Sequence, residues 1–217
     1  MDMMPFRARA WLRTGVVSDA TLPLDGVLLY QAMRRKYGPQ QATLPGTVVV
    51  QPEAADVPLK IVGLGQPDWF YACSFAQWPR DTAEGKAYWE KRVDTKRLDI
   101  VDLGRASRVV VEKGRYRSYH MPVFYRAALW VEWFGVGDIE TIDALLRDVW
   151  AIGKKTSQGW GRIIRWEVAP WMADWSVMAG ARLMRAVPEE GGVLWGIRPP
   201  YWRRENQVPC RMPSAQG

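Results

Sequence analysis

Apolar and basic side chains alternate at the start of the chain. In the stretch FRARAWLR, residues 6–13, the even positions are apolar and three of the odd positions are arginines. An alternation with a period of two is typical of a strand that buries one face. The spacing of the apolar positions then becomes that of a helix. Asp25 is placed to cap this helix, and Gly38 and Pro39 are placed to end it. The pattern predicts a strand over 6–13 and a helix from Asp25 to Gly38.

The segment between residues 39 and 103 gives weaker signals. Five prolines between positions 39 and 68 indicate loops and short extended pieces. The apolar run DWFYACSFA at 68–76 predicts a buried strand. Residues 80–103 mix charged, aromatic and apolar side chains, so we expect an exposed helix or an inserted lobe there.

A basic segment at residues 104–126 follows. It carries six arginines and lysines but a single acid, Glu112. The pattern predicts a strand over 108–112, a turn at Lys113-Gly114, and a second strand that runs to residue 134. An inserted basic hairpin is therefore expected in the middle of the fold.

The clearest helical pattern begins at Asp138. This residue is a good N-cap, and apolar side chains follow at positions 139, 142, 145, 146, 149 and 150. Gly153 is the predicted end of this helix, with Lys154 and Lys155 beside its negative end. The stretch RIIRWEV at 162–168 alternates again and predicts a strand.

The order of these elements predicts an α+β fold. A βαββαβ order with an antiparallel sheet and both helices on one face is the ferredoxin-like arrangement. We expect this domain to span residues 1–170, with an insertion at about 77–120. Residues 171–217 contain four tryptophans and are expected to form an extension that packs on the same domain.

The composition narrows the class of partner. The chain has 217 residues, of which 48% are hydrophobic, and a net charge of +7, which favours a polyanionic partner. Its thirteen tryptophans offer rings that can stack on bases. Cys73 and Cys210 suit neither a zinc site nor a disulfide framework, in keeping with a reducing compartment. We find no signal segment and no run of about 20 apolar residues, and expect a cytoplasmic protein.

Residues 153–161, GKKTSQGWG, are the first candidate binding element. Because they follow a predicted helix and precede a strand, they match neither a Walker A loop nor a Rossmann loop, and a nucleotide site is disfavoured. Glycines allow an RNA backbone to approach the main chain closely. The candidate RNA contacts are Lys154, Lys155, Thr156, Ser157, Gln158, Gly159, Trp160 and Arg162. The alternative is a plain helix-to-strand turn with Trp160 in the core.

The basic hairpin is the second candidate element. Basic residues interleaved with tyrosines supply phosphate contacts and stacking faces together, as in proteins that bind single-stranded nucleic acid. The candidates are Arg105, Arg108, Lys113, Arg115, Tyr116, Arg117, Tyr119 and His120. The alternative is a hairpin face that is merely solvated.

His120, the single histidine of the chain, raises a catalytic alternative. With Tyr116, Tyr119 and Lys113 it has the chemistry of a metal-independent ribonuclease, in which histidine or tyrosine is the base and lysine steadies the charged transition state. A lone histidine in a hairpin is more often a contact or packing residue. With one histidine, a two-histidine metal site is excluded, and we expect no metal and no cofactor.

Several segments together resemble a known family. The opening strand, TGVVSDATLPLDGVLLY, WFYACSFAQWP, KGRYRSYHMPV and IGKKTSQGWGRIIRWEV resemble the small RAMP-superfamily subunit of type IV CRISPR effector complexes. That subunit is similar to the group-five Cas proteins, which bind the 5′ handle of crRNA. The resemblance covers most of residues 5–170, and its most specific piece is the helix, Gly-rich loop and strand.

The resemblance implies a non-catalytic RNA-binding subunit of a prokaryotic ribonucleoprotein used in antiviral or plasmid defence. Lys154, Lys155, Ser157, Gln158 and Trp160 would contact the handle, and the hairpin from Lys113 to His120 would reach RNA or a neighbouring subunit. The implied partners are crRNA, the backbone and large subunits, target DNA near the protospacer-flanking motif, and an accessory helicase. Two alternatives stay open: a crRNA-processing endoribonuclease that uses His120, and a basic domain unrelated to CRISPR.

Overall fold

Three antiparallel strands form the centre of the molecule, in the order β6–β1–β7. They are β1 (Met4–Leu12), β6 (Trp130–Gly137) and β7 (Ile163–Pro170). The computed structural model describes residues 2–19, 21–38, 57–91 and 118–214. β1 pairs with a neighbour on each side, with Ala8 opposite Trp133 in β6 and Val168 in β7. The strand predicted over 6–13 is confirmed.

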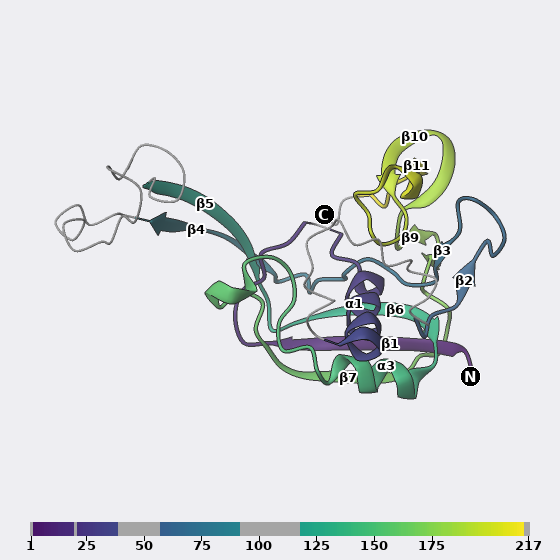
Figure 1. The fold of residues 1–217 in the computed structure, drawn as a ribbon, viewed down its shortest axis with the longest axis horizontal. Coiled ribbons are helices and arrows are strands. Elements are labelled where there is room, and N and C mark those ends of the chain that lie inside the picture. The colour runs from purple at the N-terminus through teal and green to yellow at the C-terminus, as the bar shows by residue number, and fades with distance from the viewer. Residues whose placement is uncertain (1, 20, 39–56, 92–117, 215–217) are drawn as a thin grey trace, which may run out of the picture.

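Two α-helices cover one face of this sheet (Figure 1). They are α1 (Leu24–Tyr37) and α3 (Ile139–Leu146), which contact each other. Phe6, Ala8 and Ala10 of β1 are fully buried beneath the helices, whereas the arginines that alternate with them lie on the opposite face. The period-two pattern therefore sets which face of β1 enters the core.

A further extended segment lies along the outer edge of β6. Cys73 bridges Gly135, and Gln77 bridges Glu132, both in the antiparallel sense. The short strands β2 (Ile61–Val62) and β3 (Phe70–Tyr71) pair just before it. Residues 70–77 are all buried, so the buried stretch predicted at 68–76 is present, although only β3 is a regular strand.

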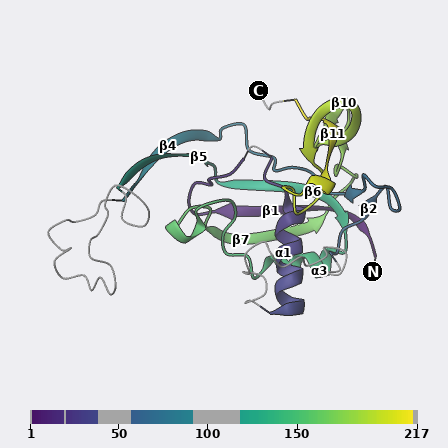
Figure 2. The ribbon, with the colours of Figure 1, turned by 45° about the horizontal axis from the view of Figure 1, so that its top comes forward.

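A two-stranded ribbon extends away from the sheet (Figures 1 and 2). It consists of β4 (Ala83–Lys91) and β5 (Tyr119–Ala127). The helix considered for 80–103 is wrong over β4, and the single strand expected to reach residue 134 is wrong, because β5 pairs with β4 and β6 pairs with β1. The strand predicted at 108–112 and the turn at Lys113-Gly114 lie outside the described residues.

The ends of the two helices correct two expectations and confirm two others. Asp25 does not cap α1, because the N-cap position is Pro23 and the Asp25 carboxylate is buried inside the first turn. Gly38 does end α1, and its N–H donates to the Arg34 carbonyl. Asp138 caps α3 by accepting from the Thr141 N–H. That helix ends at Leu146, so Gly153 is not its C-cap.

The chain after β7 adds small antiparallel pairs. They are β8 (Met178–Ala179) with β9 (Arg182–Leu183), and β10 (Val187–Gly196) with β11 (Gln207–Arg211). A second apolar cluster joins this part to the centre of the fold, with Ala186, Ile197 and Cys210 against Phe70 and Phe75.

The described residues thus form a mixed α/β structure in which the strands pair in the antiparallel sense and two α-helices are present. The prediction of a mixed, antiparallel fold is confirmed at this level. Within the described ranges, neither helix has the length and apolar character needed to cross a bilayer.

Candidate nucleic-acid interface

The Gly-rich loop, residues 153–161, lies between α3 and β7 and is held by close backbone contacts. Gly153 and Gly161 both have positive φ, of 81° and 66°. A Cβ on Gly161 would lie 1.9 Å from the Ile152 carbonyl oxygen, and a Cβ on Gly153 would lie 2.5 Å from that of Val17. These two glycines are therefore needed to close the loop, and their role is first of all structural.

The loop is also bonded to the chain that follows β1. Thr14 Oγ1 donates to the Gly159 carbonyl over 2.8 Å and accepts from the Arg162 N–H over 3.0 Å. The Gly161 N–H donates to the Gly15 carbonyl. The ends of the loop are thereby fixed, while the short 3₁₀ turn η4 (Thr156–Gln158) stands between them.

The two lysines of the loop point to different partners. Lys154 Nζ lies 2.9 Å from a carboxylate oxygen of Asp19, and both side chains are exposed. Lys155 has a left-handed backbone, with φ of 61°, which costs a non-glycine residue about 1 kcal/mol. Its ammonium lies 4.3 Å from the centre of the Trp89 ring in β4. Ser157 and Gln158 of η4 are exposed.

A second contact joins the loop to the ribbon. The ring of Trp160 lies against that of Tyr125 in β5, with 4.7 Å between the centroids. The Tyr125 ring also fills the space beside Gly15 and Gly85, where a Cβ would lie within 2.7 Å of it. Trp160 is half-buried and anchors the loop to the ribbon. The loop and the base of the ribbon form one continuous surface.

The ribbon places two candidate residues on opposite faces, because neighbours in a strand point in opposite directions. Tyr119 packs on Trp89, with 4.5 Å between the centroids, on the face that meets Lys155. His120 stacks on Tyr88 on the other face, and its Nδ1 lies 2.8 Å from a Glu90 carboxylate oxygen. Tyr119 and His120 therefore do not share a site.

The remaining candidates divide into two groups. Arg162 is half-buried, and its guanidinium lies 4.1 Å from the centre of the Trp150 ring. Six candidates of the hairpin lie outside the described residues: Arg105, Arg108, Lys113, Arg115, Tyr116 and Arg117.

Three residues of this surface were missed by sequence reasoning. Trp150 was assigned to the apolar face of α3, but it lies beyond that helix and is 51% exposed. Trp89 fell in a segment with no clear pattern, and Asp19 in a stretch that predicted no element. The alternation of β4, with half-buried Ala87, Trp89 and Lys91, was the available signal for Trp89. Nothing local in the sequence marks Asp19.

The shared features of this surface are exposed cations, accessible aromatic rings and hydroxyl or amide donors. Such a set can hold phosphates by charge and hydrogen bonds, and bases by stacking, without any covalent step. The family model described as CRISPR type IV associated protein Csf3 matches residues 5–213. A search of curated proteins finds no match. The resemblance to a type IV CRISPR subunit is confirmed. The chain belongs to the CRISPR type IV associated protein Csf3 family, and is thereby a component of a type IV CRISPR complex.

Proposed function

We propose that this chain is a non-catalytic RNA-binding subunit that caps the 5′ handle of crRNA in the type IV complex. The observation that carries the proposal is the joint surface of the Gly-rich loop and the ribbon. There the Lys155 ammonium lies over Trp89, and Trp160 packs on Tyr125. Lysines that bind phosphates next to rings that stack on bases are the usual pairing for a single strand.

The arrangement of strands supports the finer fold assignment. In a ferredoxin-like βαββαβ sheet, the first strand lies between the third and the fourth, and the second lies beyond the third. The order β6–β1–β7, with residues 73–77 along the outer edge of β6, has the same relations. In this assignment the Gly-rich loop follows the second helix of the core, and residues 171–214 extend the same domain.

The proposed position at the 5′ end of the crRNA implies the other partners of the chain. A subunit at the end of the guide RNA meets the backbone subunits on one side and the large subunit on the other. The ribbon suits such a contact, because Phe124 and Tyr88 are exposed on the face that turns away from the loop. Target DNA near the protospacer-flanking motif and an accessory helicase are partners of the assembled complex.

The test uses the purified chain and a 5′-labelled RNA that contains the repeat of the CRISPR array, without metal. We expect binding without cleavage. The variant Lys154→Ala/Lys155→Ala should bind at least about tenfold more weakly, because charge-assisted contacts are lost. The matched control is Lys60→Ala/Arg204→Ala, which removes two exposed cations elsewhere and should bind like the wild type. Equal loss in both variants, or equal binding of random RNA, would contradict the proposal.

The same experiment tests the ribonuclease alternative. The contact of His120 with Glu90 is the observation in its favour, because a carboxylate can orient a histidine base. Cleavage of the repeat RNA that disappears in His120→Ala would overturn the non-catalytic role. Binding and integrity of the RNA that are unchanged in His120→Ala support it.

A further inference from the structure

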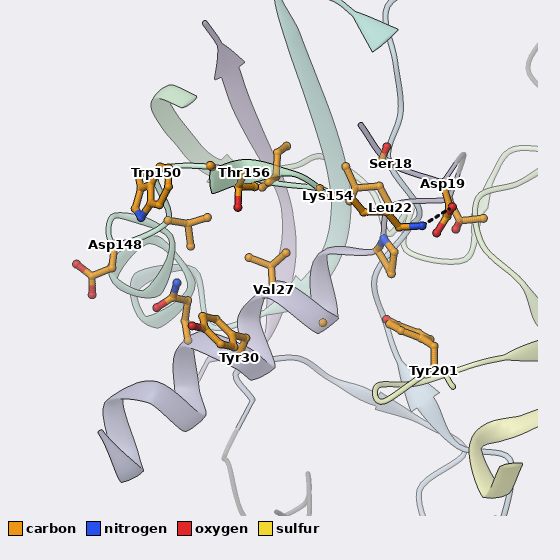
Figure 3. Close-up of a pocket in the computed structure, with 18 of the residues that line it drawn as sticks. Ser18, Asp19, Leu22, Val27, Tyr30, Asp148, Trp150, Lys154, Thr156 and Tyr201 are labelled. Atoms are coloured by element: carbon orange, nitrogen blue, oxygen red, sulfur yellow. Dashed lines mark hydrogen bonds and ion pairs between the residues drawn. The ribbon is translucent and has the colours of Figure 1, made fainter. Parts of the chain in front are cut away.

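A cleft of about 520 Å³ lies between α1 and the Gly-rich loop (Figure 3). Tyr30 and Val27 come from α1, and Trp150 and Thr156 come from the segment that leads from α3 into the loop. Lys154 closes one side of the cleft, where it pairs with Asp19. This volume is typical of a small-molecule or single-residue binding site.

Two polar groups of the cleft have no partner. The Gln31 side chain lines the cleft, is 5% exposed, and makes no hydrogen bond with any residue in the described part of the chain. The Ser18 hydroxyl also lines the cleft and is buried without a hydrogen-bond partner there. Buried polar groups are nearly always hydrogen-bonded, and leaving the Ser18 hydroxyl unpaired costs about 1–3 kcal/mol. The Ser18 hydroxyl and the Gln31 amide, which also lines the cleft, are thus available to hydrogen-bond a bound molecule.

Two aromatic rings stand at the mouth of the cleft. Trp150 is 51% exposed and Tyr30 is 41% exposed, although both are large apolar rings that burial would stabilise. Arg162 lies over one face of the Trp150 ring, and Trp150 is still half exposed. A planar ligand can stack there and still present its edge to the groups inside the cleft.

A nucleobase has the shape and chemistry that these groups require. Single-stranded RNA is recognised by bases that leave the stack, pack on aromatic rings, and have their edges read by hydrogen bonds. The amide of glutamine offers one donor and one acceptor side by side, and pairs with a base through two bonds. We propose that the cleft binds one unstacked nucleobase, whose edge is read by Gln31 and whose ring stacks on Trp150. This rests on the proposed RNA-binding role of the adjacent loop, which would hold the phosphate of the same nucleotide through Lys154.

The test measures fluorescence anisotropy with short 5′-fluorescein-labelled oligoadenylate, oligocytidylate and oligouridylate at one fixed salt concentration. The full-length chain should prefer one of the three over the least favoured by roughly 5- to 100-fold, the discrimination of one bidentate contact. Gln31→Leu should lose this preference and keep its affinity for the least favoured oligomer. Its unfolding midpoint in urea checks that the variant is folded.

Trp150 variants give a second readout. Trp150→Ala should weaken binding of the favoured oligomer by about 5- to 100-fold, since stacking on one ring is lost, and Trp150→Phe should restore most of it. Leu194→Ala, at an exposed apolar position of β10, is the control and should bind like the wild type. If Gln31→Leu does not fold, the Trp150 series still decides the question.

The outcomes distinguish base binding in the cleft from RNA binding by the loop. If Lys154→Ala/Lys155→Ala weakens all three oligomers while the wild type shows no base preference, the base pocket is wrong and the RNA-binding role stands. If no oligomer binds but the repeat RNA does, the base pocket is wrong and the RNA-binding role stands; if neither binds, both are wrong.

Two further probes identify the source of the base. A deoxy version of the favoured oligomer that binds equally well would make DNA an equal source. Binding of the free nucleoside monophosphate alone, dependent on Gln31, would overturn the RNA assignment and make a free nucleotide the ligand.

Discussion

The Arg185 side chain is 1% exposed and connects three distant parts of the chain. Its guanidinium donates to the backbone carbonyls of Tyr71, Cys73 and Ile197, and lies 3.9 Å from a carboxylate oxygen of Asp25 in α1. Burial raises the pKa of Asp25, and the nearby positive charge of Arg185 opposes this rise. Burial also raises the pKa of Tyr201, whose hydroxyl donates to Asp25. One cation thus satisfies several groups that water does not reach.

Removing that cation should destabilise the fold in a pH-dependent way. Arg185→Met should lower the free energy of unfolding by about 3–5 kcal/mol, because a buried carboxylate loses its partner. The raised pKa of Asp25 rises further in the variant. A carboxyl with a raised folded-state pKa contributes stability that is fully present below its unfolded pKa, about 3.9, and is lost as the pH increases through the folded value. The deficit in urea unfolding should therefore be larger near neutral pH than at about pH 4.

The control for this prediction removes the titrating group. In an Asp25→Asn background, the effect of Arg185→Met should no longer vary between the two pH values. A deficit that is equal at both pH values with Asp25 in place would contradict the coupling of Arg185 to Asp25.

In the proposed role, Asp19 would compete with RNA for Lys154, with which it forms an ion pair. Both partners of this ion pair are exposed, and such pairs are worth up to about 1 kcal/mol. Asp19→Asn should therefore raise RNA affinity by about two- to fivefold in anisotropy titrations and change stability little. Glu189→Gln makes the same change of charge in the exposed pair between Glu189 of β10 and Arg211 of β11, and should leave affinity unchanged. Equal gains in both variants would assign the effect to net charge alone.

At the scale of the element, the Gly-rich loop contains a matched pair of glycines. Gly161 and Gly159 both have positive φ, but a Cβ on Gly159 meets nothing within 4 Å, whereas one on Gly161 would strike the Ile152 carbonyl. Gly159→Ala should cost about 1–2 kcal/mol from backbone strain alone. Gly161→Ala should cost at least about 1 kcal/mol more, because the Ile152–Gly161 hydrogen bond is also lost. Urea unfolding measures both, and a smaller loss for Gly161→Ala would contradict the packing described for this loop.

Sequence patterns predict those elements whose signals are local. The alternation of β1 and the Asp138 cap of α3 depend on neighbouring residues, and both were predicted. The end of α3 depends on distant ones: the backbone of residues 150–152 bonds to that of 161–163 at the start of β7, and Trp166 donates to the Val149 carbonyl. Helical spacing continues to Trp150 although the helix has ended.

The candidate site also divides into residues that local sequence signals predict and residues that only long-range contacts bring together. The lysines and glycines of the loop could be chosen from their spacing and context. Their partners Asp19 and Trp89, and the cleft with Gln31, arise only when segments more than 50 residues apart meet, as Lys155 and Trp89 do. Periodicity carries no information about such contacts. The division of residues 119–137 between two sheets was hidden for the same reason, because both halves are equally apolar.

At the scale of the whole molecule, a net charge of +7 attracts RNA before any contact forms. Local phosphate contacts can be separated from this general attraction by their salt dependence. For a single strand, the logarithm of the binding constant falls with that of the salt concentration by about 0.7 for each phosphate contacted. Lys154→Ala/Lys155→Ala should therefore reduce the slope by about 1.4 if each lysine contacts one phosphate.

The control variant has the same net charge as Lys154→Ala/Lys155→Ala. Lys60→Ala/Arg204→Ala also removes two positive charges, so both variants fall from +7 to +5. Its slope should match that of the wild type. Slopes reduced equally in the two variants would indicate that the loop lysines act only through the general field.

The two contacts between the loop and the ribbon also bear on how the ribbon can move. Trp160 meets the ribbon at Tyr125, near the point where it leaves the sheet, and Lys155 meets it at Trp89, further out. If the ribbon moves relative to the sheet, Tyr125 is the contact closest to the point about which it would pivot. Spin labels at Met121→Cys and Lys60→Cys should change their separation when RNA binds, and a constant separation would show that the ribbon is rigid. In the proposed role, a small displacement of the loop by RNA would thus be enlarged at the far end of the ribbon, where a neighbouring subunit could sense whether the guide is in place.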